Sequence, residues 1–162
     1  MFCFQCEQTA KGSGCTKKGV CGKSPETAAL QDLLVHAVKG ISQYAHRARA
    51  LGVVDREVDR FAVDALFTTV TNVNFDPARL EEMLRAASGV RDRARRIFEE
   101  AAADAGSSAE RLEGPAELAL AGDLEGLVGQ GTEVGILGRR ATLGEDVSGL
   151  QELLLYGCLL YT

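Results

Sequence analysis

The sequence predicts an all-α fold, in which an N-terminal cysteine loop lies against a three-helix bundle and a second bundle begins near the C-terminus. Two observations lead to this prediction. Apolar residues recur at helical spacing through three stretches between residues 25 and 104. A shorter stretch near the C-terminus then repeats part of the first one.

The first helix is predicted to begin at residue 25. Ser24, Pro25 and Glu26 supply an N-cap, a proline at the first helical position and an acid in the first turn. Gly52 is expected to follow the last turn in a left-handed conformation. The apolar positions between them keep helical spacing: Leu30, Leu33, Leu34, Ala37, Val38, Ile41 and Ala45.

Two more helices complete the predicted bundle of residues 25–104. One is expected to start near Asp55 and fade at residues 71–74, and the next begins at the cap-plus-proline pair Asp76-Pro77. The third helix also carries four arginines among acids, which indicates a solvated face rather than a binding patch: Arg91, Arg93, Arg95 and Arg96. Short links between amphipathic helices favour an antiparallel arrangement.

Residues 105–144 are rich in Gly, Ser and Pro and are predicted to form an irregular connector, with a short extended segment at 134–137. The glycines Gly129, Gly131 and Gly135 do not match a dinucleotide-binding loop, because their spacing is G-x-G-x-x-x-G and no strand precedes them.

Residues 145–162 are predicted to start a second, truncated bundle. Leu150-Gln-Glu-Leu-Leu154 echoes Leu30-Gln-Asp-Leu-Leu34 of the first helix. The sequence stops at Thr162 without a C-cap, so we expect a chain that is cut off. Cys158 stands alone and is expected to be a buried apolar residue.

The amino-acid composition excludes some classes of binding partner. The net charge of −5 and the absence of a Lys/Arg block argue against nucleic acid. The longest apolar run, from Leu153 to Tyr161, is too short to span a membrane, and no targeting signal is visible. We therefore expect a cytoplasmic protein, in a compartment where clustered cysteines more often bind metal than form disulfides.

Residues 1–24 carry the candidate site. Cys3, Cys6, Cys15 and Cys21 are spaced C-x2-C-x8-C-x5-C, with glycines between and after them. Four thiolates can hold tetrahedral zinc or an iron–sulfur cubane. The second pair is spaced too widely for a zinc knuckle, and a glycine-rich loop lets backbone N–H groups approach cluster sulfurs. The spacing favours iron–sulfur over zinc, and both over disulfides, without excluding the alternatives.

The cysteine motif resembles the opening of the hybrid cluster proteins, also called prismane proteins, whose activity is hydroxylamine reductase. The similar segments are Met1-Phe-Cys-Phe-Gln-Cys6, Gly14-Cys15-Thr-Lys17, Cys21-Gly-Lys23, 30–34, 67–76, 134–137 and 145–154. The resemblance thus covers nearly the whole chain and is weakest between residues 101 and 131.

The resemblance implies a 4Fe-4S cluster on Cys3, Cys6, Cys15 and Cys21, and an N-terminal domain of two three-helix bundles. Hydroxylamine is reduced to ammonia and water in that family, and nitric oxide reduction is also proposed. The reaction occurs at a separate hybrid iron–sulfur–oxygen cluster, whose His, Glu and Cys ligands lie in later domains and have no match here. The cubane would pass electrons from an external donor protein to that centre.

Further expectations concern neighbouring residues. His36 and His46 are interpreted as ordinary helix residues. Lys17 and Lys18 could favour the reduced cluster, although plain solubility is the simpler role, and Phe2 and Phe4 are expected to shield the cluster and pack it onto the bundle. Two alternative functions remain open at this point: a stand-alone iron–sulfur electron carrier and a zinc-stapled interaction module.

Overall fold

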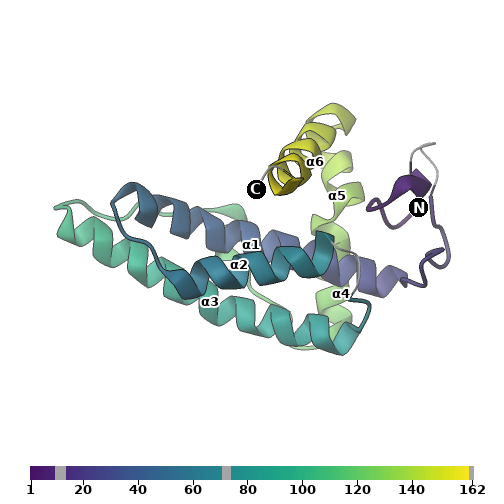
Figure 1. Cartoon of the computed structure of the whole chain (residues 1–162), viewed down its shortest axis with the longest axis horizontal. Helices are drawn as coiled ribbons and strands as arrows, with labels where there is room; N and C mark the ends of the chain where they lie inside the picture. The colour runs from purple at the N-terminus through teal and green to yellow at the C-terminus, as the bar shows by residue number, and fades with distance from the viewer. Residues whose placement is uncertain (10–13, 71–73, 161–162) are drawn as a thin grey trace.

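A long central helix, α1 (Pro25–Ala50), organises the computed structural model of the chain (Figure 1). The structure describes residues 1–9, 14–70 and 74–160, and side chains as far as residue 155. All regular structure within these ranges is helical, which confirms the predicted fold class. Besides α1 it comprises α2 (Arg56–Val70), α3 (Pro77–Asp104), α4 (Leu124–Val134), α5 (Ile136–Leu143), α6 (Glu145–Leu160) and the 3-10 turns η1 (Glu7–Thr9) and η2 (Gly114–Glu117).

The ends of α1 follow the predicted signals. Ser24 adopts an extended backbone and its hydroxyl accepts a hydrogen bond from the backbone N–H of Thr27 at 3.0 Å, which satisfies one of the free N–H groups of the first turn. At the other end Gly52 has φ of +87°, a left-handed conformation that glycine adopts without a Cβ penalty.

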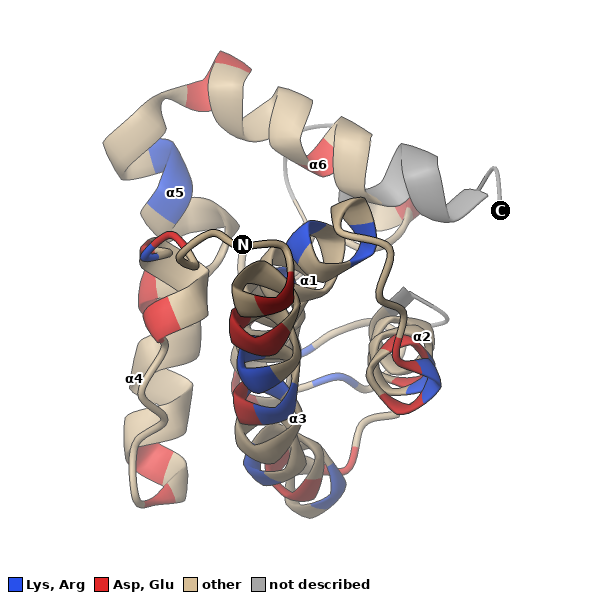
Figure 2. Cartoon of the chain, turned by 90° about the vertical axis from the view of Figure 1, so that its left-hand side faces the viewer, with Lys and Arg blue, Asp and Glu red and all other residues tan. Residues whose placement is uncertain are grey.

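The predicted helices α1, α2 and α3 are present and pack around a shared apolar core. Leu30, Leu33, Leu34 and Ile41 of α1 are fully buried, as are Leu80 and Leu84 of α3. Asp76 caps α3 by accepting from the N–H of Ala78. The arginines of α3 lie among acidic residues along the helix, as Figure 2 shows for the charged bands. One of them, Arg93, pairs with Asp55 at 2.7 Å and so ties α3 to the start of α2.

The expectation of an irregular connector over 105–144 is wrong for its second half, which forms α4 and α5. The predicted extended segment is also wrong, because Val134 ends α4 and Ile136 begins α5. Packing explains the difference. A Cβ added at Gly131 would meet the carbonyl oxygen of Ala29 at 2.1 Å, so this glycine lets α4 lie directly on α1. Helices gain most of their stability from such tertiary contacts rather than from intrinsic propensity.

The C-terminal stretch is helical as predicted, and α6 runs across the bundle at an angle to α1 and α3 (Figure 2). An ion pair of 2.6 Å between Arg139 and Glu152 links it to α5. Leu150, Leu153 and Leu154 are each more than 60% exposed on this helix. Its assignment to a second bundle stays a prediction, and the side chain of Cys158 lies outside the described residues.

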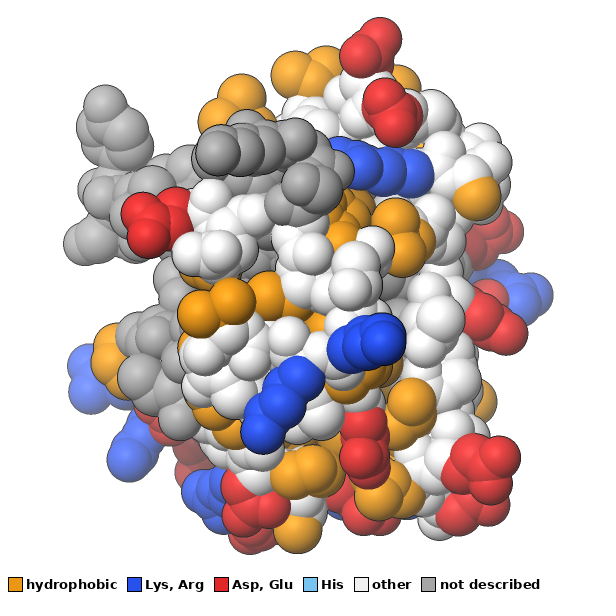
Figure 3. Space-filling model, turned by 90° about the vertical axis from the view of Figure 1, so that its right-hand side faces the viewer, with side chains coloured by type: hydrophobic (Ala, Val, Ile, Leu, Met, Phe, Trp, Pro, Cys, Tyr) orange, Lys and Arg blue, Asp and Glu red, His pale blue; other side chains and the backbone are white. Residues whose placement is uncertain are grey.

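The charge of the surface and the hydropathy of the helices both bear on possible partners. Among the described side chains on the face shown in Figure 3, acidic and basic groups are dispersed rather than gathered by sign. None of the described helices has both the length and the hydropathy of a membrane span.

Candidate metal centre

The four motif cysteines lie in the N-terminal segment, beside the first turns of α1 (Figure 1). Cys3 and Cys15 are partly buried, whereas Cys6 and Cys21 are exposed. Cys6 directly precedes η1, and Cys21 lies three residues before the N-cap of α1. The rigid end of α1 therefore anchors one end of the motif, while the other end must be held by contacts within the loop.

Backbone hydrogen bonds give the loop its shape. The N–H of Phe2 donates to the carbonyl of Cys15 at 3.0 Å, which brings the first and third cysteine segments together. The N–H of Gly19 donates to the carbonyl of Lys23 at 2.7 Å and closes the turn around Cys21. The N–H of Val20 points at the sulfur of Cys15, 3.4 Å away. Backbone donors of this kind stabilise thiolate sulfur and tune the potential of a bound cluster.

Lys23 is the most unusual residue of the site, because its side chain is completely buried. Its Nζ donates to Oε1 of Gln5 at 2.5 Å and to Oε1 of Gln31 at 2.6 Å. Burial lowers the pKa of Lys23, and the nearby Cys3 and Cys21 oppose that shift by favouring the charged form. Lys23 also lines the same small cavity as Cys3, so it lies close to the first cysteine of the motif as well as to Cys21, two residues before it.

A half-buried carboxyl group, that of Asp32, lies near the start of α1. Asp32 lines a small cavity together with Phe2, Cys3 and Phe4. Burial raises the pKa of Asp32 to about 7, with the positive charge of Arg139 acting in the opposite direction. His36 and Lys39 follow on the same face of α1, and burial lowers the pKa of both. The interpretation of His36 as an ordinary helix residue stays a prediction.

The aromatic residues of the motif pack onto the helices. The guanidinium of Arg140 in α5 lies 5.1 Å from the ring centroid of Phe4, a cation–π contact. Phe2 and Phe4 line the same small cavity as Ala28 of α1 and Ile136 of α5. The loop is thus packed against the bundle as expected, and the shielding of a cluster by these rings stays a prediction.

The donor set fits an iron–sulfur cluster by its chemistry, since it offers four thiols, an N–H donor to sulfur and a buried cation. The geometry is not that of a closed site. In the ranges that the structure describes, no three His, Cys, Asp or Glu side chains lie close enough together to bind one metal ion.

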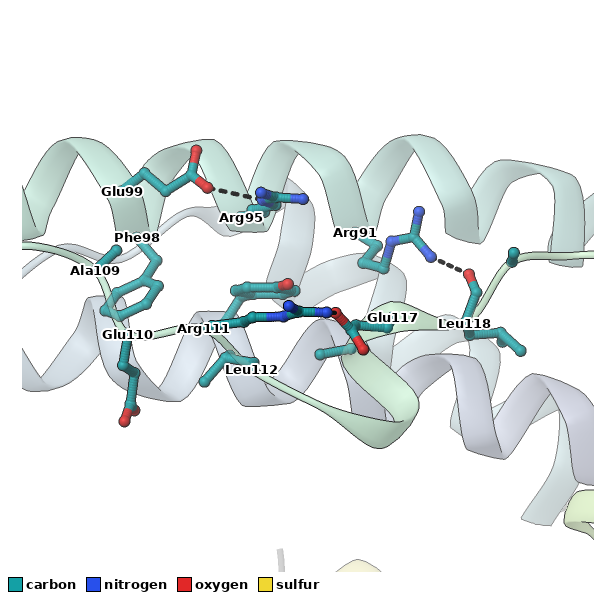
Figure 4. Close-up of a pocket in the computed structure, with 13 residues that line it drawn as sticks. Arg91, Arg95, Phe98, Glu99, Ala109, Glu110, Arg111, Leu112, Glu117 and Leu118 are labelled. Atoms are coloured by element: carbon teal, nitrogen blue, oxygen red, sulfur yellow. Dashed lines mark hydrogen bonds and ion pairs between the residues drawn. The ribbon is translucent and has the colours of Figure 1, made fainter.

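A wide groove lies elsewhere, between α3 and residues 109–119, with a volume of about 620 Å³ (Figure 4). It includes Tyr44, and twenty residues of helix at 1.5 Å each place that residue about 30 Å from the start of α1. Its basic side chains already have partners: Arg95 pairs with Glu99, Arg111 with Glu117, and Arg91 donates to the carbonyl of Leu118. The groove therefore offers little unpaired charge to a ligand.

Nearly the whole chain is similar to known proteins. The sequence profile of the Prismane/CO dehydrogenase family matches residues 1–160. The chain belongs to the Prismane/CO dehydrogenase family. Curated relatives named hydroxylamine reductase are 55% identical to it in Rhodospirillum rubrum, 52% in Burkholderia ambifaria and 49% in Methanocella arvoryzae. Each alignment covers 97% of this chain but only 28–29% of the relative.

Membership of the Prismane/CO dehydrogenase family confirms the resemblance seen in the cysteine motif. Such a family implies iron–sulfur cofactors, while the cluster type and the ligand set remain predictions. Sequence reasoning singled out the four cysteines but missed Lys23 and Asp32. Lys23 lies within the quoted Cys21-Gly-Lys23 segment, yet nothing in a sequence distinguishes a buried lysine from an exposed one.

Proposed function

We propose that this chain forms the iron–sulfur, electron-transfer part of a cytoplasmic hydroxylamine reductase, an enzyme that reduces hydroxylamine to ammonia and water. The observation that carries the proposal is the 55% identity with the hydroxylamine reductase of Rhodospirillum rubrum over 157 residues. The family match over residues 1–160 includes the complete four-cysteine motif. Because the chain spans only 29% of that relative, we assign the reduction step itself to the rest of the longer enzyme.

Cys3, Cys6, Cys15 and Cys21 are the proposed ligands of a 4Fe-4S cluster. When bound, such a cluster supplies one-electron transfer. The chain contributes the thiolates, the Val20 N–H that points at Cys15, and the packing of the loop onto α1. Cys6 and Cys21 are exposed, so an external electron-donor protein could approach this part of the loop.

The division of labour follows from coordination chemistry. Reduction of hydroxylamine consumes two electrons and two protons and breaks the N–O bond, so the substrate needs an open position on a metal. A site whose four irons are each held by a cysteine leaves no such position. Substrate binding is therefore assigned to the hybrid cluster of the full-length enzyme.

Metal and sulfide analysis tests the ligand set. The intact chain, reconstituted anaerobically with iron and sulfide, should bind about four irons and four sulfides per chain. Cys15→Ser should lose the cluster, whereas Cys158→Ser, the matched change at a cysteine outside the motif, should retain it. Colourless protein with one zinc per chain would favour the zinc-stapled alternative. Equal loss in both variants would show that the ligand set is wrong.

Turnover tests the division of labour. The reconstituted chain, supplied with a strong reductant, should produce no ammonia from hydroxylamine above the level of its Cys15→Ser variant. Robust ammonia production that disappears in Cys15→Ser would place the reaction at this cluster and overturn the assignment to a second centre.

A further inference from the structure

Lys23 connects the two ends of the cysteine segment to the bundle. Gln5, which accepts from its ammonium, lies between Cys3 and Cys6, and Lys23 itself follows Cys21 by two residues. The second acceptor, Gln31, belongs to α1. The side-chain Nε2 of Gln31 in turn donates to the carbonyl of Asn74, at the link between α2 and α3, at 2.8 Å. A continuous chain of hydrogen bonds thus runs from the cysteine loop into the three-helix bundle.

The surroundings of Lys23 suit a charged ammonium. Its Nζ donates to Oε1 of Gln5 and to Oε1 of Gln31, and Lys23 lines the same small cavity as Cys3. An ammonium offers three N–H donors, enough for both amide oxygens and one further partner. The ring of Phe75, whose centroid is 5.4 Å from Nζ, adds a cation–π contact. An ammonium without these partners would be costly to bury.

Burial determines how strongly this charge acts. Lys23 has no exposed side-chain surface, while Lys17 and Lys18 are exposed. A charge in the low-dielectric interior interacts several times more strongly with a neighbouring charge than one in water, and it is less screened by salt. The electrostatic role that the sequence suggested for Lys17 and Lys18 is therefore better placed on Lys23.

We propose that Lys23 is a positioning residue, whose buried ammonium holds the cysteine loop on α1 and raises the reduction potential of the bound cluster. The inference rests on the proposed function, since it assumes a cluster on the four cysteines. Reduction adds one negative charge to the cluster and its thiolates. A fixed positive charge that shares a small cavity with Cys3 and lies two residues from Cys21 stabilises this reduced state relative to the oxidised one.

A redox titration followed by electron paramagnetic resonance tests the proposal. Lys23→Met keeps the length of the side chain and removes its charge. At a fixed potential it should lower the ratio of reduced to oxidised cluster at least tenfold, which is 59 mV for one electron. Lys23→Arg, which keeps the charge, should recover most of the loss. Lys18→Met, the same change at an exposed lysine, should leave the ratio unchanged.

If Lys23→Met does not fold, a second variant tests the electrostatic effect of Lys23 on the reduction potential. Gln5→Glu retains the oxygen that accepts from Lys23 but adds a negative charge beside it, so it should also lower the potential. An unchanged potential in a cluster-loaded Lys23→Met or Gln5→Glu protein would overturn the electrostatic role. A wild-type chain that takes up no iron or sulfide would instead overturn the proposed function, together with this inference.

Discussion

Replacement of Gly131 by alanine would test the closest contact between α1 and α4. The added Cβ would lie 2.1 Å from the carbonyl oxygen of Ala29 and 2.6 Å from its carbon. Both are backbone atoms in the first turns of α1, so no side-chain rotation can relieve the overlap. The two helices must move apart instead.

The structure provides a scale for the effect. Ordinary van der Waals contact begins at 3.4 Å, so the helices must separate by about 1 Å, a gap that forfeits up to about half of the dispersion energy across it. Overpacking of this kind costs about 1–3 kcal/mol. The better helix propensity of alanine returns about 1 kcal/mol. We therefore expect Gly131→Ala to lower the free energy of unfolding by up to about 2 kcal/mol.

Gly129→Ala is the matched control, because it lies in the same helix with no atom within 4 Å of its added Cβ. It should raise the free energy of unfolding by about 0.5–1 kcal/mol through helix propensity alone. Urea unfolding of the intact chain, monitored by circular dichroism in reducing buffer, measures both variants. Equal stabilisation by the two substitutions would refute the close packing of α4 on α1.

Three further predictions concern α1. Burial holds the pKa of Asp32 at about 7 instead of 3.8, so between these pH values the native chain retains a proton that the unfolded chain releases. The free energy of unfolding should therefore fall by up to about 4 kcal/mol as the pH rises from about 4 to 7. Asp32→Asn should abolish this fall in urea titrations across the same pH range. Leu34→Ala should cost about 3 kcal/mol in the same assay because the side chain is fully buried, whereas Leu153→Ala, at 69% exposure, should change stability by less than about 0.5 kcal/mol. Ser24→Ala should cost about 1 kcal/mol by removing the N-cap, and a melting temperature equal to that of the wild type would contradict the capping role.

The first three helices were predictable because their signals are local. Ser24-Pro25 and Asp76-Pro77 act within one turn of the helices that they begin, and the apolar stripes of α1 to α3 are long enough to show their period. The helix α4 was missed for the opposite reason. Gly126, Gly129 and Gly131 lower its propensity, and its stability depends on contact with α1, which is distant in the sequence.

The candidate site likewise has features that the sequence predicts and features that depend on tertiary packing. The spacing of Cys3, Cys6, Cys15 and Cys21, with the residues around them, was sufficient to place the chain in the family that the comparison confirms. Thiol chemistry is a property of the residues themselves, so a sequence carries it directly. The burial of Lys23 between Gln5 and Gln31, and the partial burial of Asp32 beside the same cavity, depend on which surfaces meet after the helices pack. Charge and pKa respond to that desolvation, and only the tertiary structure decides it.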